Sequence, residues 1–80
     1  MNITKEEILQ KVQEVFRQVF DDEELSITFN TKADDIEDWD SLAHIQLVVG
    51  IEKALGIKFT SKEIHSWPTV GKMIDTILTK

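Results

Sequence analysis

Ser41 is the residue best placed for chemistry in this chain, because it begins a predicted helix directly after an acidic segment. Five carboxylates lie in the seven residues before it: Asp34, Asp35, Glu37, Asp38 and Asp40. The N-terminus of a helix carries about half a positive charge and free backbone N–H groups, so it favours a phosphate. A serine hydroxyl exposed there could carry a phosphodiester. The simpler interpretation is that Asp40 or Ser41 only caps the helix, which is worth about 1 kcal/mol, and both interpretations stay open here.

Two more specific kinds of chemistry, serine hydrolysis and metal binding, are disfavoured. Ser41 and His44 are three residues apart, but a serine hydrolase also needs an oxyanion hole and a cleft, and the sequence shows no sign of either. We expect His44 to be a boundary residue in the first helical turn and His65 to be solvated. The acidic segment lacks the glycine and glutamate of a calcium loop, and cysteine is absent. No metal site is therefore predicted.

Four helices are predicted to position Ser41. Helical spacing of apolar residues and N-cap signals predict helices over residues 4–20 and 41–55, and a short helix from Thr60 to near Ser66. They also predict a last helix, whose helically spaced apolar residues are Val70, Met73, Ile74, Ile77 and Leu78. Capping boxes are expected for Thr4 with Glu7 and for Thr60 with Glu63, and Thr69 is the expected cap of the last helix. The predicted fold class is all-α: a small bundle of three main helices plus one short helix.

A long loop is predicted between the first two helices. Residues 21–40 break the helical period, and Leu25, Ile27 and Phe29 alternate as in a strand. No partner strand is apparent elsewhere, so we expect an irregular loop pinned by these apolar side chains. A connection of this length is uncommon in so small a domain and is usually functional or mobile.

The second predicted helix has two apolar faces. One is a broad arc expected to face the core: Leu47, Val48, Ile51, Ala54 and Leu55. The other is an apolar stripe, Leu42, Ile45 and Val49, which carboxylates frame and which suits docking of a basic, partly apolar partner. Gly50 costs about 1 kcal/mol inside this helix and could permit close packing, while Gly56 is a good C-terminal stop.

Length and charge limit the classes of function. The chain has 80 residues, so a single domain over residues 1–80 is expected. The net charge of −6 argues against nucleic acid as a partner and favours partners with basic surfaces. No apolar run approaches the roughly 20 residues of a membrane span, and no signal peptide is apparent. We expect a cytoplasmic monomer, and Met1 with the capped first helix favours a free-standing protein.

The segment around Ser41 resembles the attachment motif of the acyl carrier proteins. Asp40-Ser41-Leu42 stands at the beginning of the second helix after a long loop, as the Asp-Ser-Leu motif does in that family. The resemblance covers nearly the whole chain, since the size, the acidity and the order of helices agree. Gly56-Ile57-Lys58-Phe59 resembles the family's link beyond the second helix, and Thr69-Val70 resembles the usual start of its last helix.

This resemblance implies a carrier that is not itself an enzyme. A phosphopantetheinyl transferase would esterify Ser41 with 4′-phosphopantetheine from coenzyme A in a magnesium-dependent reaction, with Asp40 and Leu42 flanking the attachment site. The terminal thiol of the arm would carry an acyl group as a thioester to acyl-loading and acyl-transferring enzymes.

The resemblance also implies two functional surfaces. One would contact partner enzymes through Leu42, Ile45, Gln46, Val49 and Glu52. The other would shelter an acyl chain, and its candidates are Leu47, Val48, Ile51, Leu55, Phe59, Ile64 and Trp67. An ordinary packed core is the alternative for this second set, since Phe59 and Trp67 are bulky.

Two positions depart from the family's housekeeping pattern. Carriers of bacterial fatty acid synthesis usually have acidic residues two and five positions after the serine, where this chain has Ala43 and Gln46. We therefore expect a specialised carrier, for secondary metabolism, polysaccharide modification or amino-acid loading. Two alternatives stay open: an unmodified acidic module that binds a protein through the apolar stripe, and an aminoacyl carrier for D-alanine or a peptide.

Overall fold

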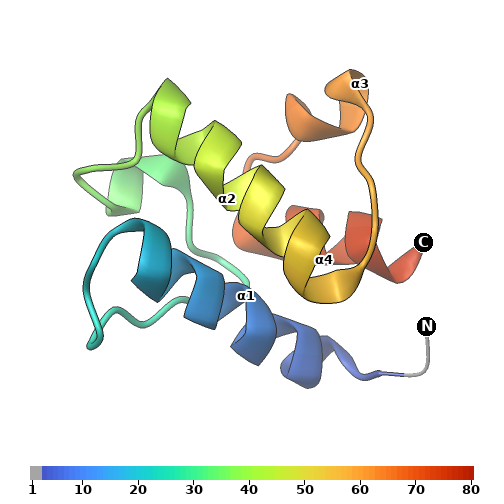
Figure 1. Cartoon of the computed structure of the whole chain (residues 1–80), viewed down its shortest axis with the longest axis horizontal. Helices are drawn as coiled ribbons and strands as arrows, with labels where there is room; N and C mark the ends of the chain where they lie inside the picture. The colour runs from blue at the N-terminus through green and yellow to red at the C-terminus, as the bar shows by residue number, and fades with distance from the viewer. Residues whose placement is uncertain (1–2) are drawn as a thin grey trace.

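The helices of the chain follow the predicted order. The computed structural model describes residues 3–80, which contain α1 (Lys5–Val19), the 3₁₀ helix η1 (Ala33–Asp35), α2 (Ser41–Leu55), α3 (Ser61–Ile64) and α4 (Val70–Leu78). Figure 1 shows α2 lying along α1, with η1 close to its first turn. The all-α bundle of three main helices and one short helix is confirmed. Residues 1–2, and the interpretation drawn from Met1, lie outside the described residues.

Capping side chains set where α1 and α3 begin. At α3 the Glu63 N–H donates to the Thr60 hydroxyl (3.1 Å) and the Thr60 N–H donates to the Glu63 carboxylate (2.9 Å), which confirms the predicted box. At α1 the Glu7 N–H donates to the Thr4 hydroxyl (3.2 Å). The box is only half formed there, because the Glu7 carboxylate accepts from the Thr4 hydroxyl (3.3 Å) and not from the Thr4 backbone.

The core is built from one face each of α1, α2 and α4. Its fully buried or nearly fully buried side chains are Ile8, Val12, Phe16, Leu47, Ile51, Val70, Met73, Ile74 and Ile77. The long loop adds Ile27, which is 4% exposed. Full burial of such a side chain stabilises a fold by roughly 1.5–3 kcal/mol. The apolar faces predicted for α1 and α4 are the ones buried in this core.

The inner face of α2 is narrower than predicted. Val48 is buried with Leu47 and Ile51, and Leu55 is half-buried. Ala54 is exposed, so its predicted place in the core is wrong. It lies one turn after Gly50, at an outer groove that polar side chains of α1 also line.

Side chains of α1 hold the first part of the long loop. Gln13 Oε1 accepts a hydrogen bond from the Ile27 N–H (3.0 Å), and Arg17 Nε donates to the Leu25 carbonyl (2.7 Å). These bonds satisfy loop backbone groups that would otherwise need a partner strand. They explain why the alternating residues of the loop form no strand within residues 3–80.

The middle of the same loop closes the N-terminus of α4. The carbonyls of Phe29 and Thr31 accept hydrogen bonds from the N–H groups of Gly71 and Val70, each at 2.7 Å. Free donors of the first helical turn are thereby satisfied. Glycine is required at position 71, because a Cβ there would lie 2.7 Å from the Phe29 carbonyl oxygen.

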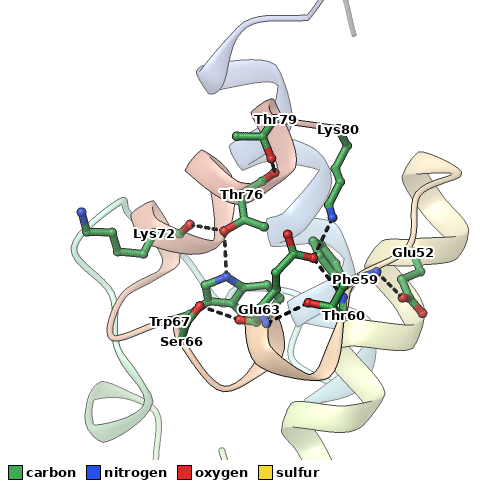
Figure 2. A network of polar contacts seen from close by, with 10 residues as sticks. All are labelled: Glu52, Phe59, Thr60, Glu63, Ser66, Trp67, Lys72, Thr76, Thr79 and Lys80. Carbon is green, nitrogen blue, oxygen red and sulfur yellow. Dashed lines mark hydrogen bonds and ion pairs between the residues drawn. The ribbon is translucent and has the colours of Figure 1, made fainter.

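Polar contacts hold the short α3 against α4 (Figure 2). The Glu63 carboxylate pairs with Lys80 Nζ at 2.6 Å, and Trp67 Nε1 donates to Thr76 Oγ1 at 3.0 Å. The hydrogen bond from Lys80, followed by that from the Thr60 N–H, lowers the pKa of Glu63, because both favour the charged carboxylate.

Candidate functional site

Asp40 caps α2 and leaves Ser41 free of that task. The Asp40 backbone is extended (φ −106°, ψ −172°), and its carboxylate accepts a hydrogen bond from the Ala43 N–H at 2.8 Å. Ser41 is the first residue of the helix, and its side chain is exposed. Of the two residues that could have capped α2, the structure selects Asp40.

A groove of about 570 Å³ lies beside Ser41, with walls from η1, α2 and α3. We call it the Ser41 groove. Its lining includes Trp39, Asp40, Ser41, His44, Ile45 and Ile64. The lining combines apolar side chains with hydroxyl, carboxylate and imidazole groups.

His44 is held by hydrogen bonds on both sides of its ring. Trp39 Nε1 donates to His44 Nδ1 at 3.2 Å, and His44 Nε2 lies 3.0 Å from the Ile64 carbonyl oxygen. An indole N–H can only donate and a carbonyl can only accept, so the partners assign the proton to Nε2. Neither ring nitrogen is free to take a proton from Ser41.

The contact between Trp39 and His44 goes beyond the boundary position expected for His44. The two rings stack with centroids 5.9 Å apart and an interplanar angle of 21°. Trp39 also packs edge-on against the fully buried Phe16 of α1 at 5.1 Å. The one signal in the sequence is the five-residue spacing of two rings across the start of a helix, which does not by itself specify a contact.

The apolar stripe of α2 is exposed as expected. Leu42, Ile45 and Val49 are 65%, 58% and 43% exposed, and Gln46 beside them is exposed too. Glu52 is different, because its carboxylate accepts a hydrogen bond from the Phe59 N–H at 2.8 Å (Figure 2). That carboxylate therefore secures the chain after α2.

The candidate acyl-pocket residues lie at different depths. Leu47 and Ile51 are fully buried and Val48 is 4% exposed. The half-buried members are Leu55, Phe59, Ile64 and Trp67. Phe59 and Trp67 contact each other edge to face at 4.9 Å, and Ile64 lines the Ser41 groove. The use of this set as an acyl pocket stays a prediction.

Residues 3–80 contain neither a cluster of metal-binding side chains nor a membrane-spanning helix. No group of three or more His, Cys, Asp or Glu side chains is arranged to hold a metal ion there. Among the helices of the same range, none is long and apolar enough to cross a membrane.

Comparisons with known proteins agree with the geometry around Ser41. A family model described as a phosphopantetheine attachment site matches residues 10–77. Among solved structures, the chain is similar to the solution NMR structure of a holo acyl carrier protein from Geobacter metallireducens, with 40% sequence identity and a TM-score of 0.84. That match covers 91% of this chain and 84% of the other. Comparison with curated proteins gave no significant match.

Proposed function

The chain belongs to the acyl carrier protein family, which carries covalently attached 4′-phosphopantetheine, and from this premise we propose that Ser41 is the attachment residue. The proposal is supported most directly by the different roles of two neighbouring residues, Asp40 and Ser41. Asp40 caps α2, and Ser41 stands exposed in its first turn beside a groove.

Attachment is a group transfer in which this chain supplies the acceptor oxygen. Ser41 Oγ forms a bond to the phosphorus of phosphopantetheine, adenosine 3′,5′-bisphosphate leaves coenzyme A, and the hydroxyl proton passes to a base of the transferase. His44 is not that base, because both of its ring nitrogens are occupied. The first turn of α2 favours the negative charge of the phosphodiester. The bound arm supplies a thiol that holds cargo as a thioester.

Partner enzymes dock on the exposed face of α2 beside Ser41. Leu42, Ile45 and Val49 supply apolar area, with Gln46 at the edge. The acidic residues that precede the helix attract a basic partner, and the net charge of −6 has the same effect at longer range. The transferase and the acyl-handling enzymes meet the same surface in turn.

A specialised pathway is supported by how few free carboxylates α2 presents. Ala43 and Gln46 are not acidic, and Glu52, the one acidic residue of α2, accepts a hydrogen bond from the Phe59 N–H. Recognition therefore depends on the apolar stripe and on the acidic loop before it, not on an acidic helix. A dedicated partner set in secondary metabolism, polysaccharide modification or amino-acid loading fits this arrangement.

Intact mass tests the attachment residue. The protein is incubated with coenzyme A and a broad-specificity phosphopantetheinyl transferase, and Ser41→Ala is treated in parallel. The mass should rise by one phosphopantetheine in the wild type and stay unchanged in the variant. No gain with several transferases would favour the alternative, an unmodified acidic module that binds a protein through the apolar stripe.

Loading assays test the specialised pathway. The modified protein is offered to the enzymes of generic bacterial fatty acid synthesis and, separately, to acyl- and aminoacyl-loading enzymes. We expect poor elongation by the generic enzymes, because α2 lacks the acidic residues that they usually meet. Elongation at housekeeping rates would contradict this part of the proposal.

A further inference from the structure

Two grooves meet at Trp39 and His44. One is the Ser41 groove of about 570 Å³, and the other, which we call the inner groove, has a volume of about 260 Å³. Ala33, Trp39 and His44 line both of them. On the far side of the pair, the inner groove reaches Trp67 and the almost fully buried Met73. The stacked rings therefore stand between the attachment residue and the core side of the molecule.

Contacts from α1, from α3 and from Trp67 brace the Trp39–His44 pair. Phe16 of α1 packs edge-on against Trp39, with centroids 5.1 Å apart. His44 belongs to α2 and reaches the Ile64 carbonyl of α3 at 3.0 Å. Trp67, beyond α3, lies 6.0 Å from the His44 ring. The pair cannot move aside without loosening contacts to each of these elements.

Opening the pair would also leave polar groups without partners. The neutral His44 ring takes the Trp39 N–H at one nitrogen and donates to the Ile64 carbonyl from the other. An alkyl chain that passed between the two stacked rings would require His44 or Trp39 to turn. Both hydrogen bonds are half-buried, so the freed N–H and carbonyl groups would be unsatisfied in the passage.

We propose that the Trp39–His44 pair is a closed partition that keeps the carried group in the Ser41 groove and so selects short or polar cargo. The inference deepens the proposed function and rests on it. A short or polar group finds apolar and polar partners in the Ser41 groove, whose lining includes Ile45, Ile64 and Ser61. A long alkyl chain in the Ser41 groove would have to pass the partition to be buried beside Met73.

The test asks where a carried octanoyl chain lies. The transferase loads the protein with phosphopantetheine that bears an octanoyl group through a stable amide, and intact mass confirms loading. Methyl groups of isoleucine and methionine are ¹³C-labelled, and nuclear Overhauser contacts to the chain are recorded. Met73 reports on the inner groove, and the chain's one other methionine is Met1. Ile45 and Ile64 report on the Ser41 groove.

Wild-type protein should show contacts from the octanoyl chain to Ile45 and Ile64 and none to Met73. His44→Ala removes both bonds of the ring, and Trp39→Phe removes the indole N–H while keeping a ring against Phe16. In each, the contact to Met73 should appear.

His65→Ala is the matched control, because His65 lines the Ser41 groove but not the inner groove. It should behave as the wild type does. The partition is overturned if the wild-type chain already contacts Met73. It is equally overturned if neither opening variant, folded by circular dichroism, brings the chain there. A loading failure would be seen earlier, as a missing mass gain, and would count against Ser41 and not against the partition.

Discussion

At the scale of single residues, Asp40 and Ser41 divide two tasks that either could perform. Aspartate and serine are both favoured as N-caps, so a local pattern cannot assign the role. The Asp40 carboxylate takes the Ala43 N–H at 2.8 Å, and Ser41 enters the helix with its side chain exposed. The proposed attachment residue is therefore separate from the residue that stabilises the helix.

Changing the two neighbours one at a time should separate stability from attachment. Asp40→Ala should lower the free energy of unfolding by about 1 kcal/mol, the usual loss for a removed cap. Ser41→Ala, an exposed substitution, should change it by less than about 0.5 kcal/mol. Urea titrations followed by circular dichroism measure both. Asp40→Asn keeps an acceptor oxygen and serves as control, and equal losses in the two alanine variants would contradict the assignment of the cap.

At the scale of helices, α1 and α2 approach closely where Gly50 faces Val15. A Cβ on Gly50 would lie 2.7 Å from Val15 Cγ1. Valine is stiff about its first side-chain torsion, and Val15 is only 6% exposed, so it has little room to move. The helical cost of this glycine is offset by the contact that it allows.

Gly50→Ala should therefore destabilise the protein although alanine is the better helix former. Overpacking costs about 1–3 kcal/mol and the helix-propensity gain is about 1 kcal/mol, so the net loss should be at most about 2 kcal/mol. Adding Val15→Ala should recover part of that loss by removing the clashing methyl group. A double-mutant cycle in urea measures the coupling. A single Gly50→Ala variant as stable as the wild type would show that the helices separate freely.

The short α3 depends on its contacts with the rest of the chain. A helix of four residues has no stability of its own. It is held by the Glu63–Lys80 ion pair on one side and by His44 on the other. The side of the Ser41 groove that α3 forms therefore depends on these polar contacts.

Acid should weaken the ion pair that holds α3. The pKa of Glu63 is lowered from its ordinary value of 4.5, chiefly by the Lys80 hydrogen bond. A carboxylate whose pKa is lower in the folded state stabilises the fold above its ordinary pKa, and the gain disappears as the pH falls through the folded value. Wild-type protein should thus exceed Glu63→Gln in melting temperature at pH 7, and the difference should close below about pH 4.5.

Glutamine can still accept the Thr60 N–H, so this variant keeps the capping box and removes only the charge. Dilute samples followed by circular dichroism give the comparison from pH 7 to pH 3. A difference between wild type and Glu63→Gln that stays constant over this range would show that the charge of Glu63 does not stabilise α3.

At the scale of the whole molecule, one core joins the three main helices and the long loop. The loop contributes Ile27 to that core, and it is bonded to α1 in its first part and to α4 in its middle. A chain of this size buries only about 60–65% of its unfolded surface. Each fully buried side chain therefore carries a large share of the stability.

The stability lost when side chains of α2 are truncated should depend on how deeply each is buried and not on its apolar character alone. Ile51→Ala should cost about 2–5 kcal/mol, because Ile51 is fully buried. Leu55 is half-buried, so Leu55→Ala should cost less than Ile51→Ala. Thermal unfolding compares the two, and Ala54→Ser at an exposed position is the control. A loss at Leu55 equal to that at Ile51 would contradict the observed edge of the core.

The sequence by itself determined the helices and the exposure of the stripe beside Ser41. The boundaries of α2 agree with the structure, and Leu42, Ile45 and Val49 are exposed as predicted. N-caps, glycine stops and apolar periods act between residues a few positions apart, so they can be recognised without the fold. The acyl carrier family was recognisable for the same reason, since its attachment motif is a local run.

Only the tertiary structure decided which residue caps α2, that Ala54 faces solvent, and that Trp39, His44 and Ile64 meet. The cap is a local choice between two suitable neighbours, whereas the other two features depend on how separate segments approach one another: α1 limits the inner face of α2, and α3 supplies the carbonyl that His44 needs. The sequence shows which side chains can donate a hydrogen bond, but it does not show which acceptor each one contacts. Contacts across 20 residues of chain, such as that between His44 and Ile64, are set by the packing of the whole core.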